Sequence, residues 1–297
     1  MTSIDLTYVG LGVHEQLIAR VADQEDYYAD EGLHVAVRDG RSWSVERLRM
    51  GATIGLGRAQ VSRLREGVPW VVLCVNTDRP LFWLLARSHI GSMADLKGRT
   101  VAVHSPTTGP GCWARILLRR HGLDPDRDVV CVERAPGDYS RDLRQLNDGS
   151  IDAAVIGSTL SPQATAAELG LNVLSFVGEE LRIPTTGIAV DPTHTPLDSV
   201  AVRGLVRANV RALRTVLDDA SIAIRNIRGL IPRLDPAEAD CFYRQYVKPF
   251  FRADGLYESA AARKPLLQLA KELGATEIPS EQELYRTELT ADWCADL

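Results

Sequence analysis

The feature that most constrains the fold is a repeated alternation of short apolar segments with amphipathic ones. The segments "IDLTYVG", "LHVAVRDG" and "ATIGLG" have the length and apolar content of strands, and each is followed by a helix-like segment, the first over residues 15–28. Parallel strands need a long crossover connection, usually a helix. This alternation therefore predicts an α/β fold with largely parallel sheets.

The alternation restarts in the middle of the chain. The strand-like segments "RTVAVH", "DVVCVE", "DAAVIG" and "LNVLSFV" again alternate with helix-like ones, and "IPTTGIAVD" then returns as an extended segment. Beyond Pro196 the chain reads as helical, with apolar residues at the spacing of a buried helix face. A second set of βα units indicates a second lobe. We predict lobe 1 from residues 1–81 plus 185–297 and lobe 2 from residues 82–184.

Charge and the spacing of metal-binding residue types exclude several classes of protein. The formal net charge is -5, whereas a nucleic-acid binder usually has a concentrated basic face. The five cysteines lack any C-x-x-C pair and the six histidines are dispersed, so neither a zinc site nor a disulfide framework is indicated. "GLGVHE" and "GLGRAQ" do not complete G-x-G-x-x-G. We expect no metal and no cofactor.

The N-terminal segment and the apolar runs bear on location. "MTSIDLTYVGLG" lacks a charged region followed by an apolar one, which a secretory signal needs. The longest apolar run, "VPWVVLCV", is far shorter than the roughly 20 residues of a membrane span. We expect a cytoplasmic protein as the sequence stands, and a periplasmic or extracellular one only if a signal has been removed. No membrane insertion is expected.

Three segments together resemble the type II periplasmic substrate-binding proteins of ABC importers, in the branch serving nitrate, sulfonates, taurine and thiamine-pyrimidine precursors. "YVGLGVHEQLIARVADQEDYYADEGLHVAVRDG" is similar to that family's opening strand, helix and turn, with Tyr27 and Tyr28 in place of the usual aromatic pair. "MADLKGRTVAV" resembles its entry into the second lobe, and "LRQLNDGSIDAAVIG" one of its helix–strand units. The resemblance runs from about residue 4 to about residue 190.

This resemblance implies a two-lobed, periplasmic-binding-protein-like (type II) fold. It has two mixed five-stranded sheets flanked by helices, a ligand cleft between the lobes, and closure by hinge bending. The C-terminal region matches only in being helical. The implied partners are a small-molecule ligand and, if the protein is exported, an ABC permease. Nothing in the residues demands a partner chain, so a monomer or weak dimer is expected.

Ligands of parallel α/β lobes bind beyond the carboxyl ends of strands, where loops lead into helix N-termini. The stretch "HSPTTGPG" has this position, and its free backbone N–H groups and hydroxyls suit an anion. The alternative is that Thr108 or Gly109 only caps the helix, with Pro110 in its first turn. The second lobe's candidate ligand residues, together with the returning segment, are Thr107, Thr108, Gly109, Ser158, Thr159, Thr185 and Thr186.

Lobe 1 contributes candidates from the loops after its own strands. They are Tyr8, Gly10, His14, Arg41, Ser42, Trp43, Gly57, Arg58 and Asn76. Arginine clamps carboxylates with two hydrogen bonds, and tryptophan stacks on flat groups. The alternatives are a solvated helix start for His14, an exposed loop for Trp43 and a hinge turn for Asn76.

These residues predict binding of a small polar, anionic organic molecule, a carboxylate or sulfonate, by an ABC-transporter-type solute-binding protein. The alternative is a cytoplasmic enzyme on the same fold, either a cofactor-independent decarboxylase or lyase or a pyrimidine- or menaquinone-type biosynthetic enzyme. Its proton donor would be His14 or His104, beside an anion clamp from Arg41 or Arg58. A cytoplasmic ligand sensor is a third possibility.

Overall fold

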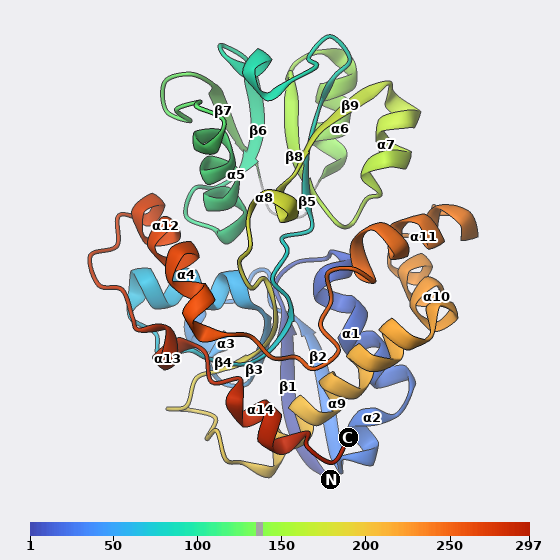
Figure 1. The fold of residues 1–297 in the computed structure, drawn as a ribbon, viewed down its shortest axis with the longest axis vertical. Helices are drawn as coiled ribbons and strands as arrows, with labels where there is room; N and C mark the ends of the chain where they lie inside the picture. Colours follow the sequence, from blue (N-terminus) through green and yellow to red (C-terminus); the bar gives the residue numbers. More distant parts are fainter. Residues whose placement is uncertain (135–138) are drawn as a thin grey trace.

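Two five-stranded sheets form the framework of the molecule, which the computed structural model describes for residues 1–134 and 139–297 (Figure 1). Sheet A has the order β2-β1-β3-β10-β4, with strands β1 (Thr2–Tyr8), β2 (Leu33–Asp39), β3 (Ala52–Gly55), β4 (Val71–Thr77) and β10 (Thr186–Val190). Sheet B has the order β7-β6-β8-β5-β9, with strands β5 (Phe82–Arg87), β6 (Thr100–His104), β7 (Val130–Arg134), β8 (Ala153–Gly157) and β9 (Leu171–Phe176). The predicted fold class is confirmed.

Each sheet is mixed, because the strand that follows a chain connection from the other sheet runs antiparallel to its neighbours. β1 pairs in parallel with β2 and β3, whereas β10 runs antiparallel between β3 and β4. In sheet B, β6 is parallel to β7 and β8, and β5 runs antiparallel between β8 and β9. The chain connects the two sheets twice, between β4 and β5 and between β9 and β10. These two connections lie side by side, since Ile183 N–H donates to the Asp78 carbonyl at 2.8 Å. We call sheet A with the helices around it lobe 1, and sheet B with the helices around it lobe 2. The domain boundaries at 81/82 and 184/185 stay a prediction.

Helices cover the sheets, and several of them begin at residues whose side chains cap them. Around sheet A the first are α1 (Val13–Gln24), α2 (Tyr27–Asp30), α3 (Val45–Leu48) and α4 (Leu56–Glu66). Around sheet B are η1 (Met93–Leu96), α5 (Gly109–Arg120), α6 (Tyr139–Asp148), α7 (Pro162–Leu169) and α8 (Val177–Glu180). Thr108 and Ser161 cap α5 and α7, and each helix has proline in its first turn.

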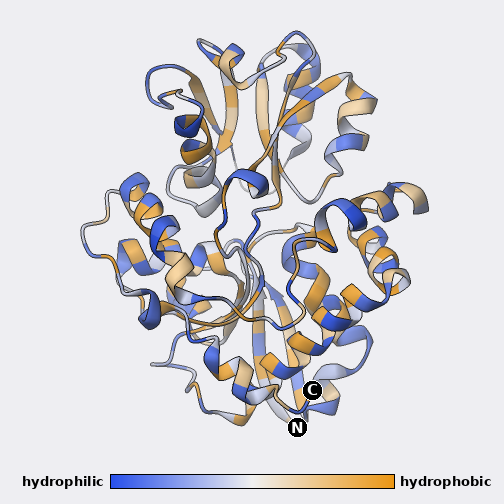
Figure 2. Ribbon diagram, in the orientation of Figure 1, coloured by the Kyte–Doolittle hydropathy of each residue, from blue (hydrophilic) through white to orange (hydrophobic). Residues whose placement is uncertain are grey.

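The C-terminal part of the chain is helical, as predicted. It contains α9 (Val200–Asp218), α10 (Ala220–Leu230), α11 (Pro236–Phe242), the π-helical η2 (Tyr243–Val247), η3 (Ser259–Ala262), α12 (Arg263–Leu273), α13 (Glu281–Leu284) and α14 (Glu288–Trp293). Helix α9 packs against α1 and α2 with a buried apolar face, and Figure 2 shows apolar residues along strands and on one side of such helices. Two arginines outside this apolar face, Arg207 and Arg211, pair with Glu31 and Asp30.

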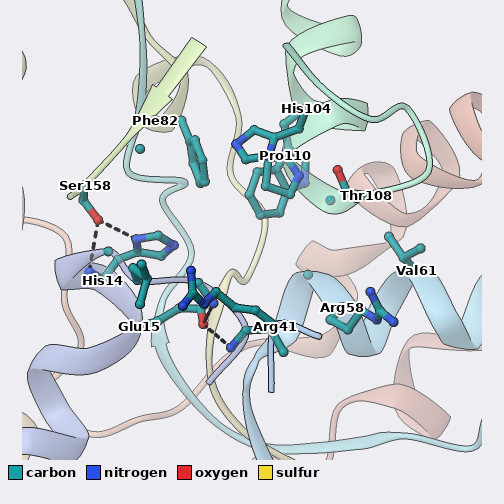
Figure 3. Close-up of a pocket in the computed structure, with 18 of the residues that line it drawn as sticks. His14, Glu15, Arg41, Arg58, Val61, Phe82, His104, Thr108, Pro110 and Ser158 are labelled. Carbon is teal, nitrogen blue, oxygen red and sulfur yellow. Dashed lines mark hydrogen bonds between the residues drawn. The ribbon is translucent and has the colours of Figure 1, made fainter. Parts of the chain in front are cut away.

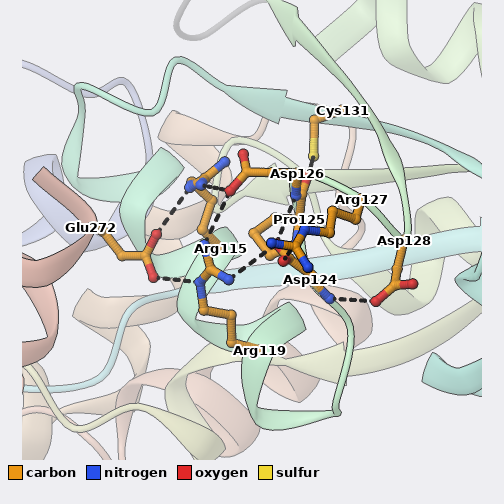
Figure 4. A network of polar contacts seen from close by, with 9 residues as sticks. All are labelled: Arg115, Arg119, Asp124, Pro125, Asp126, Arg127, Asp128, Cys131 and Glu272. Carbon is orange, nitrogen blue, oxygen red and sulfur yellow. Dashed lines mark hydrogen bonds and ion pairs between the residues drawn. The ribbon is translucent and has the colours of Figure 1, made fainter.

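Two C-terminal segments reach lobe 2 as well as lobe 1. Trp83 at the start of β5 stacks on Phe176, with ring centroids 5.3 Å apart, and meets the edge of Tyr246 in η2 at 4.8 Å. On the other side, Glu272 of α12 accepts hydrogen bonds from Arg115 (3.0 Å) and Arg119 (2.8 Å) of α5 (Figure 4). These helices therefore brace the lobes against each other.

Replacing Glu272 with alanine is expected to lower the free energy of unfolding by about 1.5–3 kcal/mol, measured by urea denaturation. The Glu272 side chain is only 3 % exposed, and hydrogen bonds to charged groups contribute this much when desolvated. The matched control is Asp126→Ala, which removes an exposed carboxylate from the same two arginines. Equal effects of the two substitutions would show that burial of Glu272 adds nothing.

Candidate functional site

A cavity of about 220 Å³ lies where loops of the two lobes meet (Figure 3). From lobe 1 it is lined by the β1–α1 loop, the first turn of α1, Arg41 and α4. From lobe 2 it is lined by Phe82, the β6–α5 loop, Tyr139 and the residues that follow β8. Both walls therefore consist mainly of strand ends and helix starts, where an α/β fold presents ligand-binding groups.

Most of the predicted site residues line this cavity. They are Gly10, His14, Arg41, Gly57, Arg58, Thr107, Thr108, Gly109, Ser158 and Thr159, together with His104 from the enzyme alternative. The chain brings α4 and α5 close at two of these glycines, because a Cβ on Gly109 would lie 3.3 Å from the Cα of Gly57. The first turns of the two helices therefore meet across the cavity.

The structure places the other predicted residues outside the cavity lining: Tyr8, Ser42, Trp43, Asn76, Thr185 and Thr186. Trp43 stacks under the guanidinium of Arg47 at 3.8 Å, within its own loop and the following helix. Asn76 is buried and accepts a hydrogen bond from Asn209 at 2.7 Å. Thr185 and Thr186 are buried in the returning segment and β10. Their role as ligand-binding residues stays a prediction.

His14 connects the lobes. Its Nδ1 lies 2.6 Å from Ser158 Oγ, and its backbone N–H donates to the same oxygen at 3.2 Å. Ser158 Oγ has no other hydrogen-bond acceptor within residues 1–134 and 139–297, so we infer that its hydroxyl donates to His14 Nδ1. The proton of the neutral His14 ring is then on Nε2. Burial lowers the pKa of His14 to about 3, so the ring is a neutral donor.

His104 is also neutral and buried. Its Nε2 lies 3.2 Å from the Tyr139 hydroxyl, and burial, with the nearby Arg134 charge, lowers its pKa to about 3. Arg134 stacks over the Tyr139 ring at 4.1 Å and pairs with Asp142 at 2.6 Å. Both histidines meet Phe82 edge-on, with centroids 5.5 and 5.8 Å apart. They complete an aromatic wall with Phe82, Trp113 and Tyr139.

Glu15 is a polar residue of the site that sequence reasoning missed, as it missed Phe82, Trp113 and Tyr139 of the aromatic wall. Its Oε2 accepts the backbone N–H groups of Val9 (2.8 Å) and Gly10 (2.6 Å). Burial raises its pKa to about 7 although these two hydrogen bonds act in the opposite direction. An acidic residue in a first helical turn is common, because it suits the helix dipole, so the sequence carries no signal that this one is buried.

The cationic groups of the cavity differ in their availability. Arg41 makes a bidentate pair with Asp39, with its Nη2 2.7 Å from Oδ2. The Arg58 guanidinium has no hydrogen bond or ion pair to any residue of 1–134 and 139–297. Arg65 and Glu66 lie on the same helix as Arg58 and also line the space. Arg65 likewise has no hydrogen bond or ion pair within residues 1–134 and 139–297, but its side chain is exposed whereas that of Arg58 is half-buried. Arg58 is therefore the unpaired cation that the cavity encloses better.

The start of α5 is more fully used than the sequence suggests. Thr108 Oγ accepts from Gly111 N–H at 3.2 Å and donates to the Ser105 carbonyl at 2.7 Å. Pro110 has no N–H, so Gly109 N–H is the donor left in this turn. Thr108 is the helix cap that the alternative interpretation predicted, and its hydroxyl is not free to donate to a ligand.

Across residues 1–134 and 139–297, no three histidine, cysteine, aspartate or glutamate side chains converge as ligands for a metal ion. Within the same ranges, no helix combines the length and apolar character needed to cross a bilayer.

Solved structures of other proteins have the same fold. A protein of Bordetella bronchiseptica RB50 is 18% identical, with a TM-score of 0.77, and the match covers 100% of this chain and 98% of that one. The alkanesulfonate-binding protein SsuA from Xanthomonas axonopodis pv. citri, bound to MOPS, is 16% identical (TM-score 0.72; 96% and 99%). The desulfurization enzyme DSZB is also 16% identical (TM-score 0.71; 99% and 99%).

The fold is that of periplasmic binding proteins, and the sequence resemblance to the type II substrate-binding proteins is confirmed. No curated protein matches the sequence. The model of the NMT1-like family matches residues 1–225 of the 297. By this match over most of its length, the chain belongs to the NMT1-like family.

Proposed function

We propose that the protein binds a small organic anion, a carboxylate or sulfonate, in the cavity between its lobes, as a solute-binding protein. The observation that carries this proposal is Arg58, whose guanidinium lines the cavity and pairs with no carboxylate in the described part of the chain. A cation without a partner inside a partly enclosed space favours an anionic occupant. Gly109, whose N–H group lies at the positive end of α5, lines the same cavity.

The contacts between lobes support binding by closure. Val13 N–H donates to the Ser158 carbonyl at 3.0 Å, and His14 bonds Ser158 Oγ, so α1 and the β8–α7 loop join above the cavity. Opening the lobes would break these contacts and expose the cavity to solvent. The sulfonate-binding proteins named SsuA share the fold, which is consistent with this mode. An exported form would deliver its ligand to an ABC permease.

The test is isothermal titration with benzoate and MOPS, with benzamide as a neutral match for benzoate. We expect both anions to bind and benzamide not to bind measurably. Arg58→Ala should weaken anion binding by about 10- to 100-fold, because a charge-assisted hydrogen bond is lost. Arg38→Ala, an exposed residue paired with Asp5, is the control and should bind normally. Equal binding of benzoate and benzamide, or no effect of Arg58→Ala, would contradict the proposal.

A second candidate function is an enzyme on the same fold, a cofactor-independent decarboxylase or lyase. The observation that favours it is Glu15, a cavity-lining carboxyl whose pKa of about 7 suits proton transfer at neutral pH. His14 and His104, proposed for this role from sequence, are held neutral by burial and are poor acids. DSZB, a desulfurization enzyme, shows that the fold includes enzymes. Analysing the titration mixtures for released carbon dioxide or sulfite separates the two functions.

A further inference from the structure

The carboxylate of Glu15 changes what the lobe 1 side of the cavity can bind. Val9 and Gly10 present two adjacent backbone N–H groups after β1, which would otherwise suit an anion. Glu15 Oε2 already accepts both of them. The first loop of lobe 1 is therefore occupied by the protein's own carboxylate, and an anionic group of a ligand would be repelled there.

The second oxygen of Glu15 is available to a ligand. Oε1 has no hydrogen-bond partner within residues 1–134 and 139–297, although the residue is only 7 % exposed and lines the cavity. Because residue 10 is a glycine, the space beside Oε1 stays open: a Cβ there would lie 2.8 Å from Oε1. A buried carboxylate oxygen without a partner favours an occupant that donates a hydrogen bond.

The polar groups of the cavity lie at two sides of it, and an aromatic side chain adjoins one of them. Figure 3 shows Glu15, His14 and Ser158 on one side of the space with Phe82 above them, and Arg58 and Thr108 on the other side. One nitrogen of His14 is directed at Ser158, which leaves Nε2–H as a donor in the cavity that Glu15 also lines. A cavity of 150 Å³ holds benzene, so about 220 Å³ suits a single ring with two substituents.

We propose, on the basis of the binding function above, that Glu15 selects aromatic anions that carry a hydroxyl group opposite the anionic group. The anion lies at Arg58 and Gly109, the ring lies along Phe82, and the hydroxyl lies between Glu15 and His14. A hydroxyl fits this end because it donates to Glu15 Oε1 and accepts from His14 Nε2–H at the same time. A methyl group of similar size leaves both protein groups without partners.

The preference depends on the charge of Glu15 and therefore on pH. With its pKa raised to about 7 by burial, Glu15 gains its charge as pH rises through neutrality, and the preference for a hydroxyl should rise between pH 6 and pH 8. The other ionisable groups that line the cavity are His14 on α1, Arg41 after β2, Arg58, Arg65 and Glu66 on α4, His104 on β6 and Tyr139 at the start of α6. The two histidines stay neutral over this range.

The experiment compares 4-hydroxybenzoate with 4-methylbenzoate by isothermal titration at pH 6, 7 and 8. We expect the hydroxyl compound to bind about tenfold more tightly at pH 8, because a hydrogen bond to a buried charge is at stake. Glu15→Gln keeps the shape of the side chain and should reduce the ratio to below about threefold and remove its pH dependence. Glu25→Gln, at the other end of α1, is the matched control and should keep the ratio.

The outcomes separate this inference from the function on which it rests. If neither benzoate binds to the folded protein, the binding function itself is wrong. If both bind with equal affinity, anion binding stands and selection by Glu15 is overturned. A tenfold ratio that persists in Glu15→Gln also overturns it, since the hydroxyl would then be recognised elsewhere. Thermal unfolding of each variant verifies that the comparison is made on folded protein.

Discussion

Replacing Asp142 with asparagine should lower the free energy of unfolding by about 3–5 kcal/mol, measured by urea denaturation at pH 7. Asp142 Oδ2 lies 2.6 Å from Arg134 Nε, and the two side chains are 1 % and 3 % exposed. Asp142 is the only acidic partner of Arg134 within residues 1–134 and 139–297, so without its carboxylate the desolvation of the buried guanidinium loses this compensation. Arg134 stacks on Tyr139, so the loss also reaches the cavity wall.

Asp5→Asn is the matched control for this substitution. Asp5 pairs with Arg38 at 3.3 Å, but both side chains are about half exposed, and such surface pairs contribute less than about 1 kcal/mol. The same chemical change is thereby made in water and in the interior. If the two variants unfold at the same urea concentration, Arg134 is compensated by groups other than Asp142, and the assignment of the ion pair as a stabilising contact is wrong.

Trp83→Ala should lower the free energy of unfolding by a similar amount, about 3–5 kcal/mol, through loss of a large buried side chain. Trp83 is fully buried and contacts Phe176 of β9, Phe242 of α11 and Tyr246 of η2. Because these partners come from both sheet B and the C-terminal helices, hydrogen exchange should also speed up in residues 236–247. That local readout distinguishes a lost brace from general destabilisation.

Trp43→Ala serves as the control for this second substitution. Trp43 is half-buried, stacks on Arg47 and packs at the margin of a core cluster of lobe 1, so its removal should lower the free energy of unfolding by about 1–2 kcal/mol, less than removal of the fully buried Trp83. Unchanged hydrogen exchange in residues 236–247 of Trp83→Ala would show that the C-terminal helices are held by other contacts.

The two-sheet fold could be predicted because short buried strands and amphipathic helices leave a strong periodic pattern. The apolar face of α9, for example, is predicted by residue spacing alone and is buried as expected. The position of the site could be predicted for a related reason. Strand ends of α/β lobes converge, so His14, Arg58, Thr107 and Ser158 were expected in one place and line one cavity.

The use of individual side chains could not be predicted, because it depends on loop conformation and on how the lobes sit. Arg41 turns back to Asp39, two residues earlier, and Trp43 turns to Arg47, so both side chains have partners within their own loop and the helix after it, which residue type alone does not indicate. The His14–Ser158 contact joins residues 144 positions apart. Glu15 reads as an ordinary first-turn acid until the depth of the β1–α1 loop is known.

The insertion of β10 between β3 and β4 has a consequence for how the protein is made. Sheet B uses strands from one continuous stretch, residues 82–176, whereas sheet A is incomplete until residues 186–190 have left the ribosome. During synthesis the later sheet can therefore close first, while β3 and β4 wait with unpaired backbone edges. The nascent chain is most exposed to aggregation in this interval, and a chaperone acting on it would need to shield β4.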